Sequence, residues 1–129
     1  MIFEMTIQIR VPDFIKGLEW YQLLLGKRPD FIPHEGFVEW ELIPGCWLQL
    51  AEGTPANGSG PFRLGVPDMD LVLERLNNEL CLTNIEIHKR DEVPVKWCTF
   101  SDPWGNHVGL FEYLNKKEET ERIDEILGK

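Results

Sequence analysis

The chain has 129 residues, 43% of them hydrophobic and 27% charged, which is the size and composition of one compact globular domain. It carries 13 basic and 22 acidic side chains, and this formal charge of −9 argues against nucleic acids and anionic membrane surfaces as partners. No apolar run is long enough to cross a bilayer and no signal-peptide pattern opens the chain, so we expect a cytoplasmic protein.

The first predicted elements are a strand and a helix. Apolar and polar residues alternate from Thr6 to Val11, as they do in a strand with one buried face. A helix follows, with Asp13 in the N-cap position and Gly26 just beyond its last apolar residue. Three strand-like stretches come next, at residues 29–33, 37–42 and 46–51.

The second half of the chain repeats the first. The turn-forming sequence GTPANGSG at residues 53–60 predicts a link, after which VPDM at Val66–Met69 matches VPDF at Val11–Phe14 at an offset of 55 residues. Strand-like stretches return at residues 83–89, 95–100 and 107–113. We therefore expect one domain over residues 1–129, with a βαβββ module at about 1–53, a linker at 54–60, a second module at about 61–114 and a helix at about 115–127.

Three stretches of sequence resemble the vicinal oxygen chelate superfamily, also called the glyoxalase, bleomycin-resistance and dioxygenase group. They are IRVPDF…WYQLLLG, LGVPDM…LERL and, most specifically, FSDPWGNHVGLFE. The resemblance covers about Met5 to Tyr113. It implies an α+β fold in which two βαβββ modules form a cup-shaped mixed sheet. Relatives of this size commonly form homodimers, and exposed sheet edges favour the same association here.

The resemblance also implies where a metal would be held. Metal-using members place His or Gln on the first strand of each module and Glu near its end. Carried over to this sequence, those positions hold Thr6, Gln49, Pro61 and Gly109. Proline and glycine offer no side-chain donor, and threonine and a neutral amide are poor ligands for transition metals. We therefore expect no metal at these positions and no cofactor. A relocated set of His107, Glu39 and Glu41 stays open as an alternative.

The predicted sheet retains a face suited to a small molecule. Alternation along the strands places both aromatic and polar side chains on it, the mixture that small-molecule pockets use. The candidate ligand-binding residues are Gln8, Arg10, Trp47, Gln49, Arg63, His107 and Phe111, with Trp97 and Trp104 at the rim. The two arginines either clamp a carboxylate or phosphate, or pair with Glu39 and Glu41 and hold the sheet together.

The sequence favours a metal-independent small-molecule-binding protein that sequesters a planar aromatic antibiotic or toxin. The alternative is a lyase, isomerase or dioxygenase-like enzyme of the same superfamily, metal-free or with relocated metal ligands, in which His107 acts as general base. A ligand-sensing or purely interacting module is a third possibility. The expected partners are a small molecule and a second copy of the chain, with no nucleic acid and no membrane.

Overall fold

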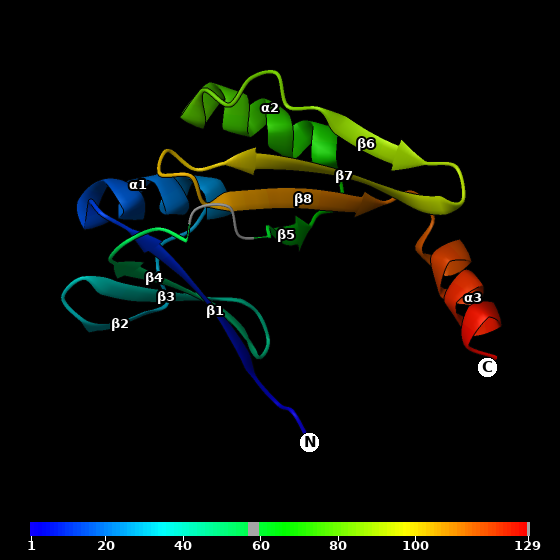
Figure 1. Cartoon of the computed structure of the whole chain (residues 1–129), viewed down its shortest axis with the longest axis horizontal. Coiled ribbons are helices and arrows are strands. Elements are labelled where there is room, and N and C mark those ends of the chain that lie inside the picture. The colour runs from blue at the N-terminus through cyan, green and yellow to red at the C-terminus, as the bar shows by residue number, and fades with distance from the viewer. Residues whose placement is uncertain (57–59, 129) are drawn as a thin grey trace. The chain divides into compact units, whose positions relative to one another are not determined.

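The computed structural model describes residues 1–56 and 60–128, so part of the predicted linker, residues 57–59, lies outside the described residues. The chain forms two compact units, Met1–Ser59 with Ser101–Asn106, and Gly60–Phe100 with His107–Lys129. Each unit contains one four-stranded sheet, and the elements follow one another as βαβββ in both (Figure 1). The predicted α+β class with two βαβββ modules is confirmed. None of the helices in the described part is long and apolar enough to span a membrane.

The first unit is built on a mixed sheet. Its elements are β1 (Met5–Val11), α1 (Phe14–Leu25), β2 (Phe31–His34), β3 (Phe37–Ile43) and β4 (Cys46–Glu52). The strand order is β1-β4-β3-β2, with β1 parallel to β4 and the other pairs antiparallel. As predicted, the Asp13 carboxylate accepts a hydrogen bond from the Lys16 amide, and Gly26 ends α1 in the left-handed conformation.

The core of the first unit lies on one face of this sheet. Alternate residues of β3 and β4 are fully buried there together with the apolar face of α1, and burial of each large side chain contributes about 1.5–3 kcal/mol. These residues are Val38, Trp40, Leu48, Leu50, Trp20, Tyr21 and Leu24. Gly17 lets α1 approach β1, since a Cβ at this position would collide with Val11. The opposite face of the sheet, which carries the intervening residues, is left free of the helix.

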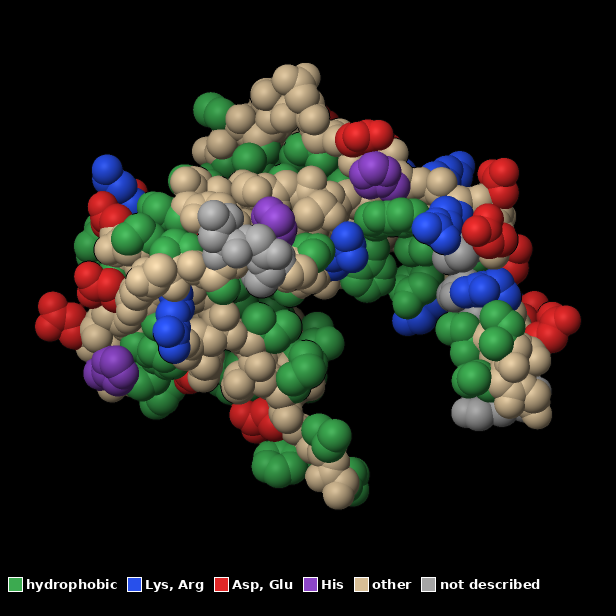
Figure 2. Space-filling model, viewed as in Figure 1, with side chains coloured by type: hydrophobic (Ala, Val, Ile, Leu, Met, Phe, Trp, Pro, Cys, Tyr) green, Lys and Arg blue, Asp and Glu red, His purple; other side chains and the backbone are tan. Residues whose placement is uncertain are grey.

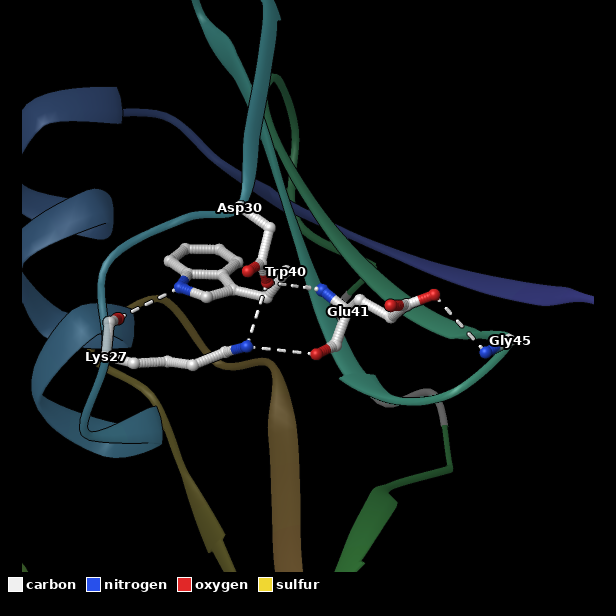
Figure 3. Close-up of polar contacts among 5 residues, drawn as sticks. All are labelled: Lys27, Asp30, Trp40, Glu41 and Gly45. Carbon is white, nitrogen blue, oxygen red and sulfur yellow. Dashed lines mark hydrogen bonds and ion pairs between the residues drawn. The ribbon is translucent and has the colours of Figure 1, made fainter.

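A polar cluster fixes the connection between α1 and β3 (Figure 3). The Asp30 carboxylate accepts from Lys27 Nζ at 2.9 Å and from the Glu41 amide at 2.8 Å, while Lys27 Nζ also donates to the Glu41 carbonyl at 3.0 Å. The hydrogen bond from Lys27, with that from Glu41, lowers the pKa of the exposed Asp30 carboxyl. The buried Trp40 indole donates to the Lys27 carbonyl at 3.0 Å, so the loop is held both at the surface and from the core.

The predicted DPWGN turn belongs to the first unit. Asp102 is only 4% exposed, and its carboxylate accepts four hydrogen bonds. Oδ1 accepts from the Trp104 and Asn106 amides, both at 2.9 Å, and Oδ2 accepts from Tyr21 Oη and Asn106 Nδ2, both at 2.7 Å. Asn106 Nδ2 also donates to the Arg10 carbonyl at 3.0 Å. The turn is thus bonded to both α1 and β1, and the buried carboxylate is fully compensated.

The second unit repeats the arrangement and adds a C-terminal helix. Its elements are β5 (Phe62–Gly65), α2 (Met69–Leu80), β6 (Ile87–Arg90), β7 (Val93–Ser101), β8 (His107–Tyr113) and α3 (Lys116–Leu127). The strand order is β5-β8-β7-β6, with β5 parallel to β8. The core residues are Met69, Leu76, Cys98, Phe100, Val108 and Leu110. Met69 donates its amide to Glu112 Oε1 at 2.6 Å, which ties the start of α2 to β8.

One predicted strand begins later than expected. The sequence predicts a strand over residues 83–89, whereas β6 starts at Ile87. Cys81 ends α2 with φ of 56°, and Asn84 has φ of 57°. These left-handed residues cannot lie in an extended strand, so the chain needs several residues to turn from the helix into the sheet. Asparagine tolerates this conformation better than most residues do. Asn84 was therefore the residue in this stretch that indicated a turn and not a strand.

We expect Tyr21→Phe to lower the free energy of unfolding by about 1.5–3 kcal/mol, because a buried carboxylate loses one of its donors while the ring still fills its site. Tyr113→Phe is the matched control. This tyrosine is 41% exposed, so the loss of its hydroxyl should change the free energy of unfolding by less than about 0.5 kcal/mol. The measurement is the urea midpoint of both variants. Equal midpoints for Tyr21→Phe and wild type would contradict the role given to the Asp102 cluster.

Candidate functional site

A chain of polar side chains crosses the helix-free face of the first sheet. Gln8 pairs in register with Gln49, and Gln49 with Glu39, so the three side chains lie side by side on one face. Arg10 Nε donates to Gln8 Oε1 at 2.9 Å, Gln8 Nε2 to Gln49 Oε1 at 3.3 Å, and Gln49 Nε2 to Glu39 Oε1 at 2.7 Å. The hydrogen bonds therefore all run in one direction, from a guanidinium to a carboxylate. Three of the predicted site residues are brought together here.

Trp47 lies on the same face, next to Thr6 and Glu41 in the strand register. Its side chain is half-buried, and its indole Nε1 is shielded from solvent without a hydrogen-bond partner in the described part of the chain. A buried N–H left in this state costs about 1–3 kcal/mol. Such a donor would gain a hydrogen bond if a ligand displaced the side chains that cover it and placed an acceptor against it.

The face of the second sheet that points away from α2, called its helix-free face below, is organised around Arg63. This residue pairs in register with Gly109, and its side chain runs across that glycine, since a Cβ at Gly109 would lie 2.8 Å from Arg63 Cγ. Arg63 Nη2 donates to Thr99 Oγ1 at 3.0 Å. Thr99 is a site residue that the sequence analysis missed. Its alternation with Trp97 along β7 is the signal that places it on this face.

Aromatic rings surround this arginine along the strands. Phe111 lies over Gly65, because a Cβ at Gly65 would come within 2.7 Å of Phe111 Cζ. Its ring meets the Tyr113 ring edge-on, with centroids 5.6 Å apart, and the Trp97 ring stacks on His88 at 5.7 Å. The face is therefore mainly aromatic, with the Arg63 side chain across its strands and Lys116 Nζ 5.3 Å from the Tyr113 ring centroid at its end.

The titratable groups near this face differ in what they can do. Half-buried His107 lies two positions before Gly109 on β8 and so belongs to the same face by alternation. A role for it as general base stays a prediction. Burial raises the pKa of the Cys98 thiol, whereas the charge of Arg63 acts in the opposite direction. Cys98 is fully buried, as structural rather than reactive cysteines are.

The residues at the family's metal positions do not fit a metal ion. Gln49 uses its amide on Gln8 and Glu39, and the space above Gly109 is taken by the cationic Arg63 side chain. Within residues 1–56 and 60–128, no group of three His, Cys, Asp or Glu side chains could hold an ion. In the relocated set, Glu39 accepts from Gln49, and Glu41 accepts from the Gly45 amide at 3.3 Å.

A cleft of about 540 Å³ lies elsewhere in the first unit, against the start of α1 and the β2–β3 hairpin. Its lining includes Phe14, Ile15, Leu18, Ile32 and His34. None of the predicted site residues takes part in it, because it opens on the helix side of the sheet. Trp104, predicted at the rim of the site, is half-buried in the DPWGN turn.

Comparisons with known proteins place the fold. No family model and no curated protein sequence matches the chain. Among solved structures, a fosfomycin resistance protein, FosX, from Listeria monocytogenes is similar at a TM-score of 0.70 and 15% identity, covering 89% of this chain and 95% of that one. A lactoylglutathione lyase from Agrobacterium tumefaciens is similar at 0.66 and 17%, covering 84% and 93%. At these identities the likeness concerns the fold alone.

A third solved structure is more similar to this chain in sequence. The glyoxalase/bleomycin resistance protein from Catenulispora acidiphila is 30% identical to this chain, with a TM-score of 0.64, and the match covers 85% of this chain and 97% of that one. The sequence motifs, the two βαβββ modules and this identity over nearly the whole relative agree. The chain therefore belongs to the glyoxalase/bleomycin resistance family of the vicinal oxygen chelate superfamily.

Proposed function

We propose that the chain is a small-molecule-binding protein that takes up planar aromatic compounds on the helix-free faces of its sheets, without a resident metal, and sequesters them. The observation that carries this proposal is the indole Nε1 of Trp47, which is buried without a partner among the described residues. Its half-buried ring is a surface on which a flat ligand can stack, worth about 0.5–1.5 kcal/mol beyond area burial. The N–H at its edge would then orient a ligand acceptor.

The polar chain from Arg10 to Glu39 supports the same function. Its four side chains already hold one another, so a ligand that bonds to them does not have to order them first. Binding to groups that are already in place retains affinity that flexible side chains would lose to entropy. Each amide in this chain both donates and accepts, which also offers fixed polar contacts beside the Trp47 ring.

A second candidate function is an enzyme of the same superfamily with His107 as general base. Half-buried His107 lies on the same strand face as Gly109 and the Arg63 side chain that crosses it. A base next to a fixed cation is a combination that proton abstraction uses. The described residues supply no cluster of His, Cys, Asp or Glu that could hold a metal, so sequestration is the first proposal.

A homodimer in the cytoplasm completes the proposal. Met1, Ile2, Phe3 and Met5 are 115%, 90%, 84% and 53% exposed, and Figure 2 shows hydrophobic side chains along this N-terminal segment. The segment leads into β1, which is an edge strand of its sheet. Exposed apolar residues beside an unpaired strand edge favour association with a second copy.

Trp47→Phe should weaken the binding of planar aromatic compounds about tenfold, because the N–H is lost and the indole is replaced by a smaller aromatic ring, and 1.4 kcal/mol is a factor of ten. Stability should be unchanged or slightly higher, since an unsatisfied donor is removed. Hits from a thermal-shift screen of neutral, cationic and anionic planar aromatics would be measured by calorimetry, next to the urea midpoint.

Trp20→Phe is the control for this experiment, because this tryptophan is 8% exposed in the core and its truncation should lower stability without changing affinity. A wild-type protein that binds no planar aromatic of any charge would overturn the proposed function. So would a Trp47→Phe variant that loses stability and keeps its affinity.

The purified protein should contain less than stoichiometric metal, and chelation should leave its melting temperature unchanged, because the family's positions lack suitable donors. Elemental analysis by inductively coupled plasma mass spectrometry, before and after dialysis against EDTA, measures both. One equivalent of Zn, Ni, Mn or Fe that is lost together with stability would contradict this prediction and favour the enzyme hypothesis.

Light scattering at micromolar concentration should give twice the chain mass of 15.0 kDa. Phe3→Asp should shift this mass toward the monomer, because a charge in the apolar segment opposes its burial. Ile15→Asp is the matched control, since Ile15 is 65% exposed on α1, away from the N-terminal segment in sequence. A wild-type mass of one chain would contradict the dimer.

A further inference from the structure

Among the described residues, Arg63 is a cation without an ion-pair partner. The salt bridges of the described residues join Lys27 to Asp30, Arg75 to Glu79, Arg90 to Glu92, and Lys96 to Asp70 and Glu112. Arg63 takes part in none of these, although the chain carries 22 acidic side chains. Its hydrogen bond goes to a neutral hydroxyl, Thr99 Oγ1, at 3.0 Å. Within the described part of the chain, no carboxylate therefore forms an ion pair with this guanidinium.

The position of the guanidinium is nevertheless fixed. The Arg63 stem lies along Gly109, where any side chain would displace it, and Thr99 holds one nitrogen at the far end. Guanidinium has five N–H donors in a planar fork, and the bond to Thr99 uses one of them. The remaining donors are arranged for a planar oxyanion, to which arginine binds through two parallel hydrogen bonds.

The surroundings of the guanidinium indicate what else the ligand contains. Phe111 lies over Gly65, the next position on the same face of β5, and Trp97 is two positions from Thr99 on β7. These rings offer apolar surface on which a flat ring stacks. A charge-assisted hydrogen bond to the guanidinium would add to this stacking.

The charge of the face sets the charge of the ligand. Lys96 points to the helix side of the sheet by alternation and is paired with Asp70 and Glu112. Another arginine in the strands of this unit, Arg90 on β6, has its Nη1 4.0 Å from Glu92 Oε1. Lys116 Nζ lies 5.3 Å from the centroid of the Tyr113 ring at the end of this face, whereas the Arg63 side chain crosses the strands themselves. The planar fork of Arg63 matches a carboxylate through two parallel hydrogen bonds.

We infer that the helix-free face of the second sheet selects planar aromatic carboxylates, with Arg63 binding the carboxylate and Phe111 and Trp97 contacting the ring. This inference rests on the proposed function, the binding of planar aromatic compounds, and names the chemical class of the ligand. The same arginine also accounts for the difference between this chain and the metal-using members of the family. Where the resemblance implies a ligand to a divalent cation, at Gly109, this chain places an arginine side chain instead.

Three probes of one shape test this inference: naphthalene-2-carboxylate, naphthalene-2-methanol and naphthalene-2-methylammonium, each titrated calorimetrically at the same ionic strength. The wild-type protein should bind the carboxylate about tenfold more tightly than the alcohol, and the ammonium more weakly than either. Arg63→Gln should reduce the carboxylate to the affinity of the alcohol. Arg63→Lys keeps the charge but loses the planar fork, so part of the preference should remain.

Two further variants separate positioning from charge. Thr99→Val removes the hydroxyl that holds Arg63 and should lower carboxylate affinity several-fold, while alcohol affinity stays the same. Arg90→Gln, the matched control, removes the same charge from β6 of the same unit, where the side chain is 67% exposed, and should leave the preference unchanged. Because Arg63 is exposed, its replacement is not expected to prevent folding.

The outcomes distinguish the two proposals. If none of the three probes binds to the wild-type protein and the broader screen of planar aromatics also fails, the proposed function is overturned and this inference with it. If the probes bind with equal affinity, or if Arg63→Gln retains the carboxylate preference, this inference is wrong while the proposed function stands. A preference lost equally in Arg63→Gln and Arg90→Gln would show only the effect of overall charge, and would also overturn the inference.

Discussion

The buried carboxylate of Asp102 is the interaction on which the first unit depends. It stands at the centre of four hydrogen bonds, two from backbone amides within its own turn and two from the side chains of Tyr21 and Asn106. Burial and the adjacent negative charge of Asp102 raise the pKa of the Tyr21 hydroxyl, so this donor keeps its proton. The cluster links residues 101–106 to α1 and β1. The side chains of β1 on the helix-free face form one end of the candidate site.

Both candidate faces follow from the alternation of side chains between the two faces of each sheet. One set of alternate residues is buried against the core, which fixes the backbone, while the other set is released to carry polar and aromatic groups. The same backbone supports two different arrangements: a chain of hydrogen bonds from Arg10 to Glu39 on the first sheet, and a single arginine among rings on the second. Function in this fold is decided by those released positions.

Arg10 and Arg63 show how the surroundings of equivalent side chains set their chemistry. Arg10 is linked through two amides to Glu39, so its charge is balanced within the sheet at a distance. Arg63 has a hydroxyl as its partner and crosses Gly109, whose missing side chain makes room for it. Alternation alone left open whether each arginine binds a ligand anion or pairs within the sheet. The contacts favour pairing within the sheet for Arg10 and anion binding for Arg63.

The sequence by itself determined the class of fold, because the repeat of VPD and the apolar periods of two and of three to four residues are local signals of strand, cap and helix. It also determined which residues share a strand face. Only the tertiary structure decided that the DPWGN turn packs with the first unit, that Thr99 meets Arg63, and that the Trp47 N–H is left without a partner in the described chain. These depend on contacts between residues far apart in sequence, where register and packing, which no local pattern encodes, select the neighbours.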